Sequence, residues 1–353
     1  MKSNSFHKSF KLNDTSFTTK EELLSFSKEI NESIFSFLSD WFKEDYYVIV
    51  QTSGSTGKPK LIQLKKEFMI NSALATGEFF NLKENTTALL CLSTDYIAGK
   101  MMLVRALTLG WRLDVVGAIS NPLKDLEKHY DFSAMVPLQL SNSLSELYKL
   151  KQLIVGGGVV SNDLIDAIQN IPTKVYATYG MTETITHIAV KKLNNFSSLR
   201  GTKQSKSFYK LLPNVDISQD TRNCLVIEAP KVSGERVITN DVVKIVSKTA
   251  FEWLGRFDNV INSGGVKLHP EKIEEKLSSL ISNRFFVAGV QDEVLGERLV
   301  LVVEGEQKLI DFSAIKNLTK YETPKQVYFI DEFIETETKK IQRTKTLKKC
   351  YAS

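Results

Sequence analysis

Residues 151–179 read KQLIVGGGVVSNDLIDAIQNIPTKVYATY and combine two apolar runs with a more polar segment between them. The runs at 151–156 and 174–179 are rich in β-branched and aromatic residues, which predicts two strands. The segment 161–170 has the apolar spacing of a helix. A strand–helix–strand unit of this kind forms parallel strands, so this stretch predicts a parallel sheet covered by helices.

The same alternation extends toward the N-terminus. Strand-like runs occupy 46–51, 88–93 and 112–116, and helices are predicted over 66–80, 98–109 and 137–149. Between Thr19 and Phe42 the apolar residues recur every three or four positions, which predicts one amphipathic helix. Thr19 and Glu22 have the spacing of a capping box at its start.

The pattern changes beyond about residue 195. The runs NCLVIEAP, ERVITN and VVKIVS are short strands separated by turns, which predicts an antiparallel β subdomain. A small α+β unit follows, with a helix over 270–281 and strands in RFFVAGV and RLVLVVEG. The polar, glycine-containing stretch 255–265 separates the two textures. We therefore predict an α/β fold with a large domain over 1–256 and a small C-terminal domain over 257–353.

Composition excludes several classes of protein. The 353 residues are 42% hydrophobic, enough for a sizeable core, and the net charge of +5 is spread along the chain rather than gathered in the basic stripe of a nucleic-acid binder. Three cysteines and four histidines are too scattered for a zinc site or a disulfide framework. With no apolar run of transmembrane length and no signal-peptide core at the N-terminus, we expect a cytoplasmic protein.

The segment TSGSTGKPK, residues 52–60, is the first candidate site. Glycine lets backbone N–H groups approach an anion closely, and hydroxyl and lysine side chains donate further hydrogen bonds, so the segment predicts a cradle for a polyphosphate. Only two residues separate Gly54 from Gly57, a spacing that argues against a Walker A loop. The residues of the predicted cradle are Thr52, Ser53, Gly54, Ser55, Thr56, Gly57 and Lys58.

This loop resembles the phosphate loop of the adenylate-forming superfamily, which includes acyl-CoA synthetases, adenylation domains of nonribosomal peptide synthetases, and luciferases. The superfamily's other motifs are matched along the chain by VGGG (155–158), YGMTE (179–183), ITND (238–241), GRFDNVINSGGVKLHPEKIE (255–274) and TKKIQR (338–343). The matches span most of the chain, which makes the resemblance specific. Only 51 residues precede the phosphate loop, fewer than in most of the superfamily.

The resemblance implies a site for ATP and Mg²⁺. Thr182 would contact the phosphate, Glu183 would hold Mg²⁺, and Lys340 would be the lysine that promotes adenylation. The nucleotide-binding residues that it implies are Gly156, Gly157 and Gly158 along adenine, Tyr179 and Gly180 in the second motif, and Asp241 and Arg256 at the ribose. These residue types suit attack of a carboxylate on the α-phosphate, because charge develops on the phosphoryl oxygens and on pyrophosphate.

The resemblance also implies two reaction steps and a mobile small domain. An acyl-adenylate would form with release of pyrophosphate, and the acyl group would then pass to CoA. Asp258 would be the pivot of the small domain. The loop that swings toward the active site on the CoA side would carry Ser263, Gly264 and Gly265.

Within the superfamily, VPLQL (136–140), SGGVKLHPEKIE and the helix around Arg105 look most like the o-succinylbenzoate–CoA ligases of menaquinone biosynthesis. That acid has a second carboxylate, which would need a charged partner in an apolar pocket. Arg105 is predicted to be this partner, with Tyr96, which replaces the family's histidine, and His187 as further acyl-pocket candidates. The alternatives are a ligase for another aryl or acyl acid, an enzyme that loads a carrier protein, and an inactive nucleotide-binding protein; the oligomeric state is left open.

Overall fold

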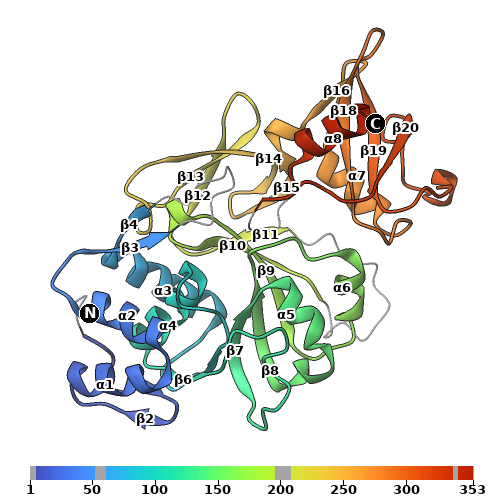
Figure 1. The fold of residues 1–353 in the computed structure, drawn as a ribbon. Coiled ribbons are helices and arrows are strands. Elements are labelled where there is room, and N and C mark those ends of the chain that lie inside the picture. The colour runs from blue at the N-terminus through green and yellow to red at the C-terminus, as the bar shows by residue number, and fades with distance from the viewer. Residues whose placement is uncertain (1–4, 52–60, 195–207, 337–340, 353) are drawn as a thin grey trace.

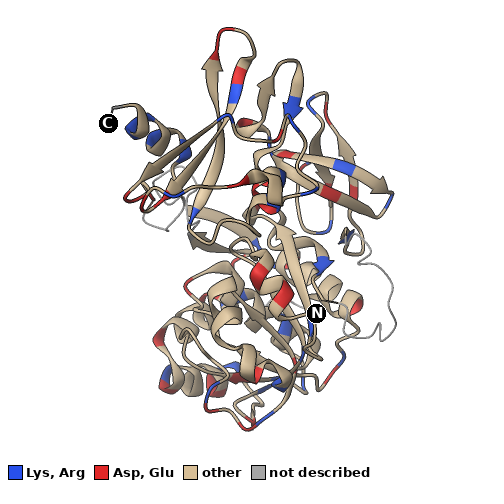
Figure 2. Cartoon of the chain, turned by 90° about the vertical axis from the view of Figure 1, so that its right-hand side faces the viewer, with Lys and Arg blue, Asp and Glu red and all other residues tan. Residues whose placement is uncertain are grey.

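The computed structural model describes residues 5–51, 61–194, 208–336 and 341–352 (Figure 1). Within these ranges a larger unit carries a thirteen-stranded mixed sheet, and a smaller unit is built around a second sheet. Lys and Arg positions are interspersed with Asp and Glu positions along both units (Figure 2). No helix in the described ranges is both long and apolar enough to cross a membrane.

One half of the large sheet is parallel, which confirms the predicted sheet. The strands lie in the order β9-β8-β7-β5-β6-β1, and every neighbouring pair in this order is parallel. β2 pairs antiparallel with β1 at that edge. These strands span Lys11–Leu12 (β1), Thr15–Ser16 (β2), Thr87–Leu90 (β5), Arg112–Val115 (β6), Tyr130–Met135 (β7), Leu150–Val155 (β8) and Lys174–Gly180 (β9).

Helices cover both faces of the parallel strands. Ile154 of β8 belongs to the core cluster that includes α3 and α4, whereas its neighbours Leu153 and Val155 belong to the cluster that includes α5 and α6. Successive strand residues point to opposite faces, so the two clusters lie on opposite sides of the sheet. The helices span Lys66–Phe80 (α3), Ile97–Leu109 (α4), Pro137–Asn142 (α5) and Asn162–Ala167 (α6).

The other half of the large sheet is antiparallel, as predicted. It continues the parallel half without a break, because β10 pairs antiparallel with β9 and is followed in space by β11, β15, β14, β13 and β12. β14 is one long strand that runs through both ERVITN and VVKIVS, with a register shift between Val242 and Val243. The strands span His187–Lys192 (β10), Tyr209–Leu211 (β11), Asp216–Gln219 (β12), Cys224–Glu228 (β13), Val237–Ser247 (β14) and Ala250–Arg256 (β15).

The smaller unit has its own α+β core. β16, β17, β18 and β19 form an antiparallel sheet, and β20 adds to β19 in parallel. Its two hydrophobic clusters draw on residues from Ile261 onward only. The elements are Phe257–Asn259 (η3), Ile261–Ser263 (β16), Val266–Leu268 (β17), Pro270–Leu277 (α7), Phe285–Asp292 (β18), Gly296–Glu304 (β19), Phe312–Ala314 (η4), Gln326–Ile330 (β20) and Arg343–Ala352 (α8).

The prediction of one helix from Thr19 to Phe42 is wrong, because the structure has two helices in this segment. α1 (Lys20–Ile30) begins with the expected capping box between Thr19 and Glu22. The break comes at Asn31, whose backbone is extended and whose side-chain oxygen accepts a hydrogen bond from Ser33 N at 2.8 Å. Asn31 therefore caps a second helix, α2 (Glu32–Phe42), because its side chain competes with the helical hydrogen bonds.

Other strands also differ from expectation. β3 (Tyr47–Gln51) does not join the parallel strands but pairs antiparallel with β4 (Leu61–Lys65) in a separate two-stranded sheet. β7 was not predicted, because polar Asp131 and Ser133 interrupt its apolar pattern. Both side chains hydrogen-bond within the sheet, Ser133 Oγ to Leu89 O at 2.9 Å and Thr87 N to Asp131 Oδ2 at 2.9 Å. The predicted helix 137–149 is α5 followed by a 3₁₀ helix, η1 (Leu144–Lys149).

Candidate active site

Candidate residues follow the carboxyl ends of neighbouring parallel strands. Tyr96 lies after β5, the glycine run 156–158 after β8, and Thr182 with Glu183 after β9. β7 lies between β5 and β8 and completes the row. On the far side of β5 lies β6, so the strand order changes direction between β5 and β7. In open α/β sheets ligands bind outside the carboxyl ends at such a point, and the fold brings these candidates to that edge.

The glycine run passes close over the end of β9. Gly156 N donates a hydrogen bond to Met135 O at 3.1 Å, and a Cβ at Gly156 would lie 2.6 Å from Thr178 Oγ1. Gly157 has a φ of +78°, which side chains other than glycine rarely adopt. The backbone angle of Gly157 therefore favours glycine, a side chain at Gly156 would displace Thr178, and Gly157 and Gly158 are exposed.

Thr182 and Glu183 lie on a 3₁₀ turn, η2 (Thr182–Thr184), directly after β9. The Glu183 side chain is exposed and Thr182 is half-buried. A carboxylate with a nearby hydroxyl supplies the oxygen ligands that Mg²⁺ uses together with substrate phosphates. Among the described residues no three His, Cys, Asp or Glu side chains gather around one point, so Mg²⁺ at Glu183 would take most of its ligands from phosphate and water.

The turn after Glu183 is strained. Ile185 has φ +67° and ψ −64°, and Thr186 N donates to Thr184 O at 2.8 Å, which makes a tight γ-turn around a β-branched residue. A Cβ at Gly180 would lie 2.1 Å from Thr186 O, so β9 must carry glycine where this turn approaches it. Strain of this kind persists only where the surroundings fix it, and it is concentrated at functional sites.

Asp241 is the best-connected polar group of the site. It lies on β14 opposite Arg256 on β15, and its side chain is almost fully buried. Tyr179 Oη donates to Asp241 Oδ2 at 2.7 Å, and Trp253 Nε1 donates to Asp241 Oδ1 at 3.1 Å. Burial and the Asp241 charge raise the pKa of Tyr179 far above its usual value, so the phenol stays a donor. Trp253 was missed, although it lies three residues before Arg256.

Arg256 connects this carboxylate to the predicted pivot. Arg256 Nη1 lies 3.7 Å from Asp241 Oδ1, and Arg256 Nη2 lies 3.5 Å from Asp258 Oδ2. Both Arg256 and Asp258 are exposed, unlike Asp241. The structure therefore brings Tyr179 and Asp241, which are 62 positions apart, together with Arg256 and Asp258.

Arg105 is buried on α4 with only 2% of its surface exposed. Its contacts are long and neutral: Nε to Thr76 Oγ1 at 3.4 Å, Nη2 to Thr186 Oγ1 at 3.4 Å, and Nη1 to Met102 Sδ at 3.7 Å. None of the described contacts of Arg105 is with a carboxylate. Burial lowers the pKa of Arg105 to about 10, so the guanidinium remains charged at neutral pH.

His187 is also buried, beside Arg105. Its Nε2 lies 3.5 Å from Thr76 Oγ1, and burial together with the Arg105 charge holds the pKa of His187 well below its usual value. His187 and Ser72 line a cavity of about 260 Å³ between α3, β10 and the segment 212–215. Ser72 Oγ lies 3.0 Å from Thr186 Oγ1, which is also a hydrogen-bond partner of Arg105 Nη2. Thr186 therefore connects the lining of this cavity with Arg105. Tyr96 is different, because its side chain is 61% exposed.

Some predicted residues are not brought to this edge. The turn between β16 and β17 contacts the turn between β18 and β19 in the small unit, through a hydrogen bond from Gly264 N to Leu295 O at 2.8 Å. Ser263 is buried and Gly264 packs against Leu295, whereas a Cβ at Gly265 would meet no atom within 4 Å, so only the tip of this turn faces open space. The predicted phosphate loop, Thr52, Ser53, Gly54, Ser55, Thr56, Gly57 and Lys58, and Lys340 lie outside the described residues.

An ion pair in the small unit was also missed. Arg343 and Glu274 form two parallel hydrogen bonds, Nη1 to Oε1 at 2.7 Å and Nη2 to Oε2 at 2.8 Å. Val287 N donates to the same Oε1 at 2.9 Å. This pair fixes the start of α8 against α7 and β18. Both residues lie inside the quoted motifs, but no spacing rule connects positions so far apart in sequence.

A family model described as AMP-binding enzyme matches residues 7–241 of the chain. A solved structure of an acyl-CoA synthetase (AMP-forming)/AMP-acid ligase II-like protein from Dyadobacter fermentans is 36% identical, with a TM-score of 0.63. That match covers 95% of this chain and 99% of the other. The likeness to that protein therefore extends over almost the whole of both chains.

Other relatives have a more specific name. A 2-succinylbenzoate–CoA ligase from Lactococcus lactis is 26% identical over 332 residues, which cover 87% of this chain and 72% of that protein. An o-succinylbenzoate coenzyme A synthetase from Bacillus subtilis, solved in complex with ATP and magnesium ion, has a TM-score of 0.70 at 18% identity. That match covers 94% of this chain and 82% of the other, and at this identity it shows a shared fold.

Proposed function

We propose that this chain, which belongs to the AMP-binding enzyme family, uses ATP to activate a carboxylic acid and transfers the acyl group to CoA. The acid carboxylate attacks the α-phosphate, the bond to pyrophosphate breaks, and the acyl-adenylate then reacts with the CoA thiol to release AMP. The observation that carries this proposal is the Asp241 carboxylate, held by Tyr179 and Trp253 next to the strand ends where ligands bind.

Asp241 keeps the capacity to bind a ribose. Each carboxylate oxygen can accept two hydrogen bonds, and Tyr179 and Trp253 use one on each oxygen. The remaining acceptor positions suit ribose hydroxyls, and exposed Arg256 lies beside them. Because Tyr179 and Trp253 fix the carboxylate in advance, little ordering is needed when the nucleotide binds.

Thr182 and Glu183 act at the phosphates in this scheme. Thr182 would donate its hydroxyl to a phosphate oxygen, and Glu183 would hold Mg²⁺. The bound ion would offset the negative charge that develops on the phosphates. The strained turn around Ile185 keeps both residues at the end of β9. The roles of the 52–58 loop and of Lys340 rest on the family resemblance.

We propose o-succinylbenzoate as the acid. It has one carboxylate to be activated and a second to be recognised. Arg105 is the matching group, because it is a buried cation whose described partners are neutral and distant. A carboxylate beside it would form a charge-assisted pair in a site that water scarcely reaches. The names of the relatives at about 26% identity support this choice.

The small unit is proposed as a separate domain that begins after Arg256 and turns about Asp258 between the two steps. Its hydrophobic clusters contain no residue from the larger unit, and Gly265 at the tip of the 263–265 turn faces open space. In the proposed cycle the small unit turns before this tip reaches the active site. Asp258→Pro, which fixes φ at the pivot, should leave adenylation intact and abolish thioester formation.

The function is tested by two assays on the same preparation. ATP–pyrophosphate exchange is measured with a panel of aryl and succinyl acids, and CoA thioesters are then sought by mass spectrometry. The proposal expects exchange only when an acid is present and a thioester only when CoA is added, with o-succinylbenzoate the best acid. Exchange without any thioester would favour carrier-protein loading, and nucleotide binding without exchange would indicate an inactive relative.

A further inference from the structure

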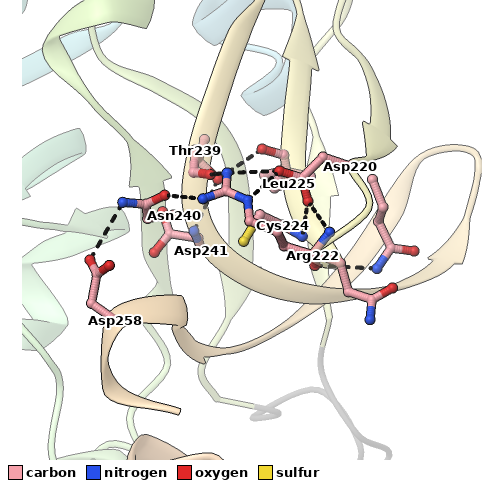
Figure 3. Close-up of polar contacts among 10 residues, drawn as sticks. Asp220, Arg222, Cys224, Leu225, Thr239, Asn240, Asp241 and Asp258 are labelled. Atoms are coloured by element: carbon pink, nitrogen blue, oxygen red, sulfur yellow. Dashed lines mark hydrogen bonds and ion pairs between the residues drawn. The ribbon is translucent and has the colours of Figure 1, made fainter.

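Arg222 lies outside every motif that identified the family, yet it is the centre of a polar cluster (Figure 3). It occupies the turn between β12 and β13. Its guanidinium donates to Asp220 Oδ2 from Nε at 2.8 Å, to Asn240 Oδ1 from Nη1 at 2.8 Å, and to Thr239 O from Nη2 at 3.1 Å. One planar group therefore connects the β12–β13 turn with β14.

The turn itself is rigid. Asp220 Oδ1 accepts hydrogen bonds from the backbone N–H of Arg222 at 2.8 Å and of Cys224 at 2.9 Å. The other oxygen, Oδ2, forms the ion pair with the guanidinium at 2.7 Å. Because the Asp220 carboxylate binds both the backbone N–H and the guanidinium of Arg222, the Arg222 side chain has a defined direction toward β14.

One side of the Arg222 contacts leads to the ribose site. Thr239 and Asn240 directly precede Asp241 on β14. Thr239 Oγ1 accepts a hydrogen bond from Asp241 N at 3.1 Å and donates to Leu225 O at 2.8 Å. Arg222 therefore fixes the backbone from which the Asp241 carboxylate projects.

The other side leads to the pivot. The Arg222 guanidinium lies over the Phe257 ring, 5.2 Å from its centre. Asn240 Nδ2 donates to Asp258 Oδ2 at 3.4 Å. Phe257 immediately precedes Asp258, so Arg222 contacts the residue next to the pivot, while Asn240 contacts the pivot carboxylate itself.

We propose that Arg222 is a positioning residue that couples nucleotide binding at Asp241 to the orientation of the small unit. The inference rests on the proposed roles of Asp241 and Asp258. Rotation at Asp258 would break the Asn240 contact, and Asn240 is also held by Arg222 Nη1. Because Arg222 holds Thr239 O and the Asn240 side chain next to Asp241, a change at the pivot alters the support of the Asp241 carboxylate, so nucleotide affinity and orientation are linked, and each influences the other by the same factor.

The test uses the full chain and three variants. Arg222→Lys keeps the charge but loses the planar fork and the stacking on Phe257. Asn240→Ala removes both the hydrogen bond from Arg222 Nη1 and the contact with Asp258. Arg236→Lys is the matched control, because Arg236 is an exposed arginine at the start of the same β14 whose described partner, Glu228, lies 3.4 Å away.

Two properties are measured. ATP affinity is obtained by calorimetry without any acid, and the orientation of the small unit is followed by energy transfer between a label on each unit. Arg222→Lys should weaken ATP binding by about fivefold or more and shift the transfer efficiency. Asn240→Ala interrupts the same series of contacts between Arg222 and Asp258, so it should also shift the transfer efficiency and weaken ATP binding, whereas Arg236→Lys should change neither.

A change in melting temperature alone for Arg222→Lys, with affinity and orientation as in the native protein, would make Arg222 a purely structural residue and overturn the inference. An orientation shift in Arg222→Lys without any loss of ATP affinity would also overturn the coupling. Failure of the native protein to bind ATP would instead reject the proposed function. The two failures are therefore distinguishable.

Discussion

Arg105 in the large unit and Arg343 in the small unit both hold a guanidinium away from bulk water, in opposite electrostatic settings. Arg343 meets the Glu274 carboxylate through two short hydrogen bonds. Arg105 is more deeply buried, yet its described partners are two hydroxyls and a thioether, all at 3.4 Å or more. The chain neutralises one cation itself and surrounds the other with neutral partners in the described residues.

The difference separates a structural charge from a binding charge. A buried ion without a counter-charge lowers stability, because desolvation is not offset by pairing. The fold nevertheless keeps Arg105 charged at neutral pH, at a pKa of about 10. In the proposed enzyme the missing counter-charge is the second carboxylate of the acid. The predictions therefore concern substitutions at Arg343, at Arg105 and at His187 beside Arg105.

The largest effect is expected from Arg343→Ala. It leaves Glu274 largely buried without its partner, which should lower the free energy of unfolding of the small unit by about 3 kcal/mol. Arg284→Ala is the control, because the Arg284 side chain is 49% exposed beside Glu304 and Glu335, and its loss should cost under about 1 kcal/mol. Urea unfolding of both variants checks the ranking, and equal losses would contradict it.

The ion pair between Arg343 and Glu274 is a contact that the sequence did not predict. The local sequence pattern predicted strands β5, β6, β8 and β9 and helix α3 from Lys66 to Phe80, because each is a contiguous apolar or periodic segment. Glu274 and Arg343 lie 69 positions apart, and only the packing of α7 and α8 against β18 brings them together. Strand β7 was also not predicted from its sequence, because Asp131 is polar. In the structure its carboxylate accepts a hydrogen bond from Thr87 N of the neighbouring strand.

The residues of the candidate site also fall into those that sequence motifs indicated and those that only the folded structure shows. Motifs indicated Asp241, Tyr179 and Arg256, and the structure confirms that the three lie together. Trp253 and Arg222 carry no motif, because their role depends on cross-strand register and on a turn that only the folded antiparallel strands form. Arg105 was predicted from the chemistry of the acid, but the neutrality of its neighbours was not visible in the sequence.

The second effect concerns binding. If Arg105 meets the second carboxylate of the acid, Arg105→Ala should raise the apparent KM for o-succinylbenzoate by about a hundredfold, with the KM for ATP unchanged. Benzoylpropionate, which lacks that carboxylate, should be a poor substrate for the native protein and lose little more in the variant, because both changes remove one interaction. Values of kcat/KM for both acids with both proteins complete the cycle. Additive losses would show that the two groups do not meet.

A third effect concerns acid sensitivity near Arg105. The native pKa of His187 lies below that of the unfolded chain, so its stabilisation is complete above about pH 6.5 and is lost as the pH falls, when the unfolded chain takes up a proton first. From pH 7.5 to 5.5 the native protein should lose about 1.4 kcal/mol more than His187→Gln. Exposed His129→Gln is the control and should follow the native curve. Parallel curves for all three proteins would contradict a buried neutral imidazole.

The smallest effect tests the comparison most directly, because one substitution is made at both positions. Arg105→Met replaces an unpaired buried cation by an apolar side chain of similar length, which removes desolvation without stranding a carboxylate, so the free energy of unfolding should stay constant or rise by up to about 1 kcal/mol. Arg343→Met strands Glu274, so the same measurement should fall. Denaturant unfolding of the two variants in the absence of ligands reads out the two signs. A loss at Arg105 equal to that at Arg343 would mean that Thr76, Thr186 and Met102 already stabilise the cation, and its proposed role toward a ligand carboxylate would lose its physical basis.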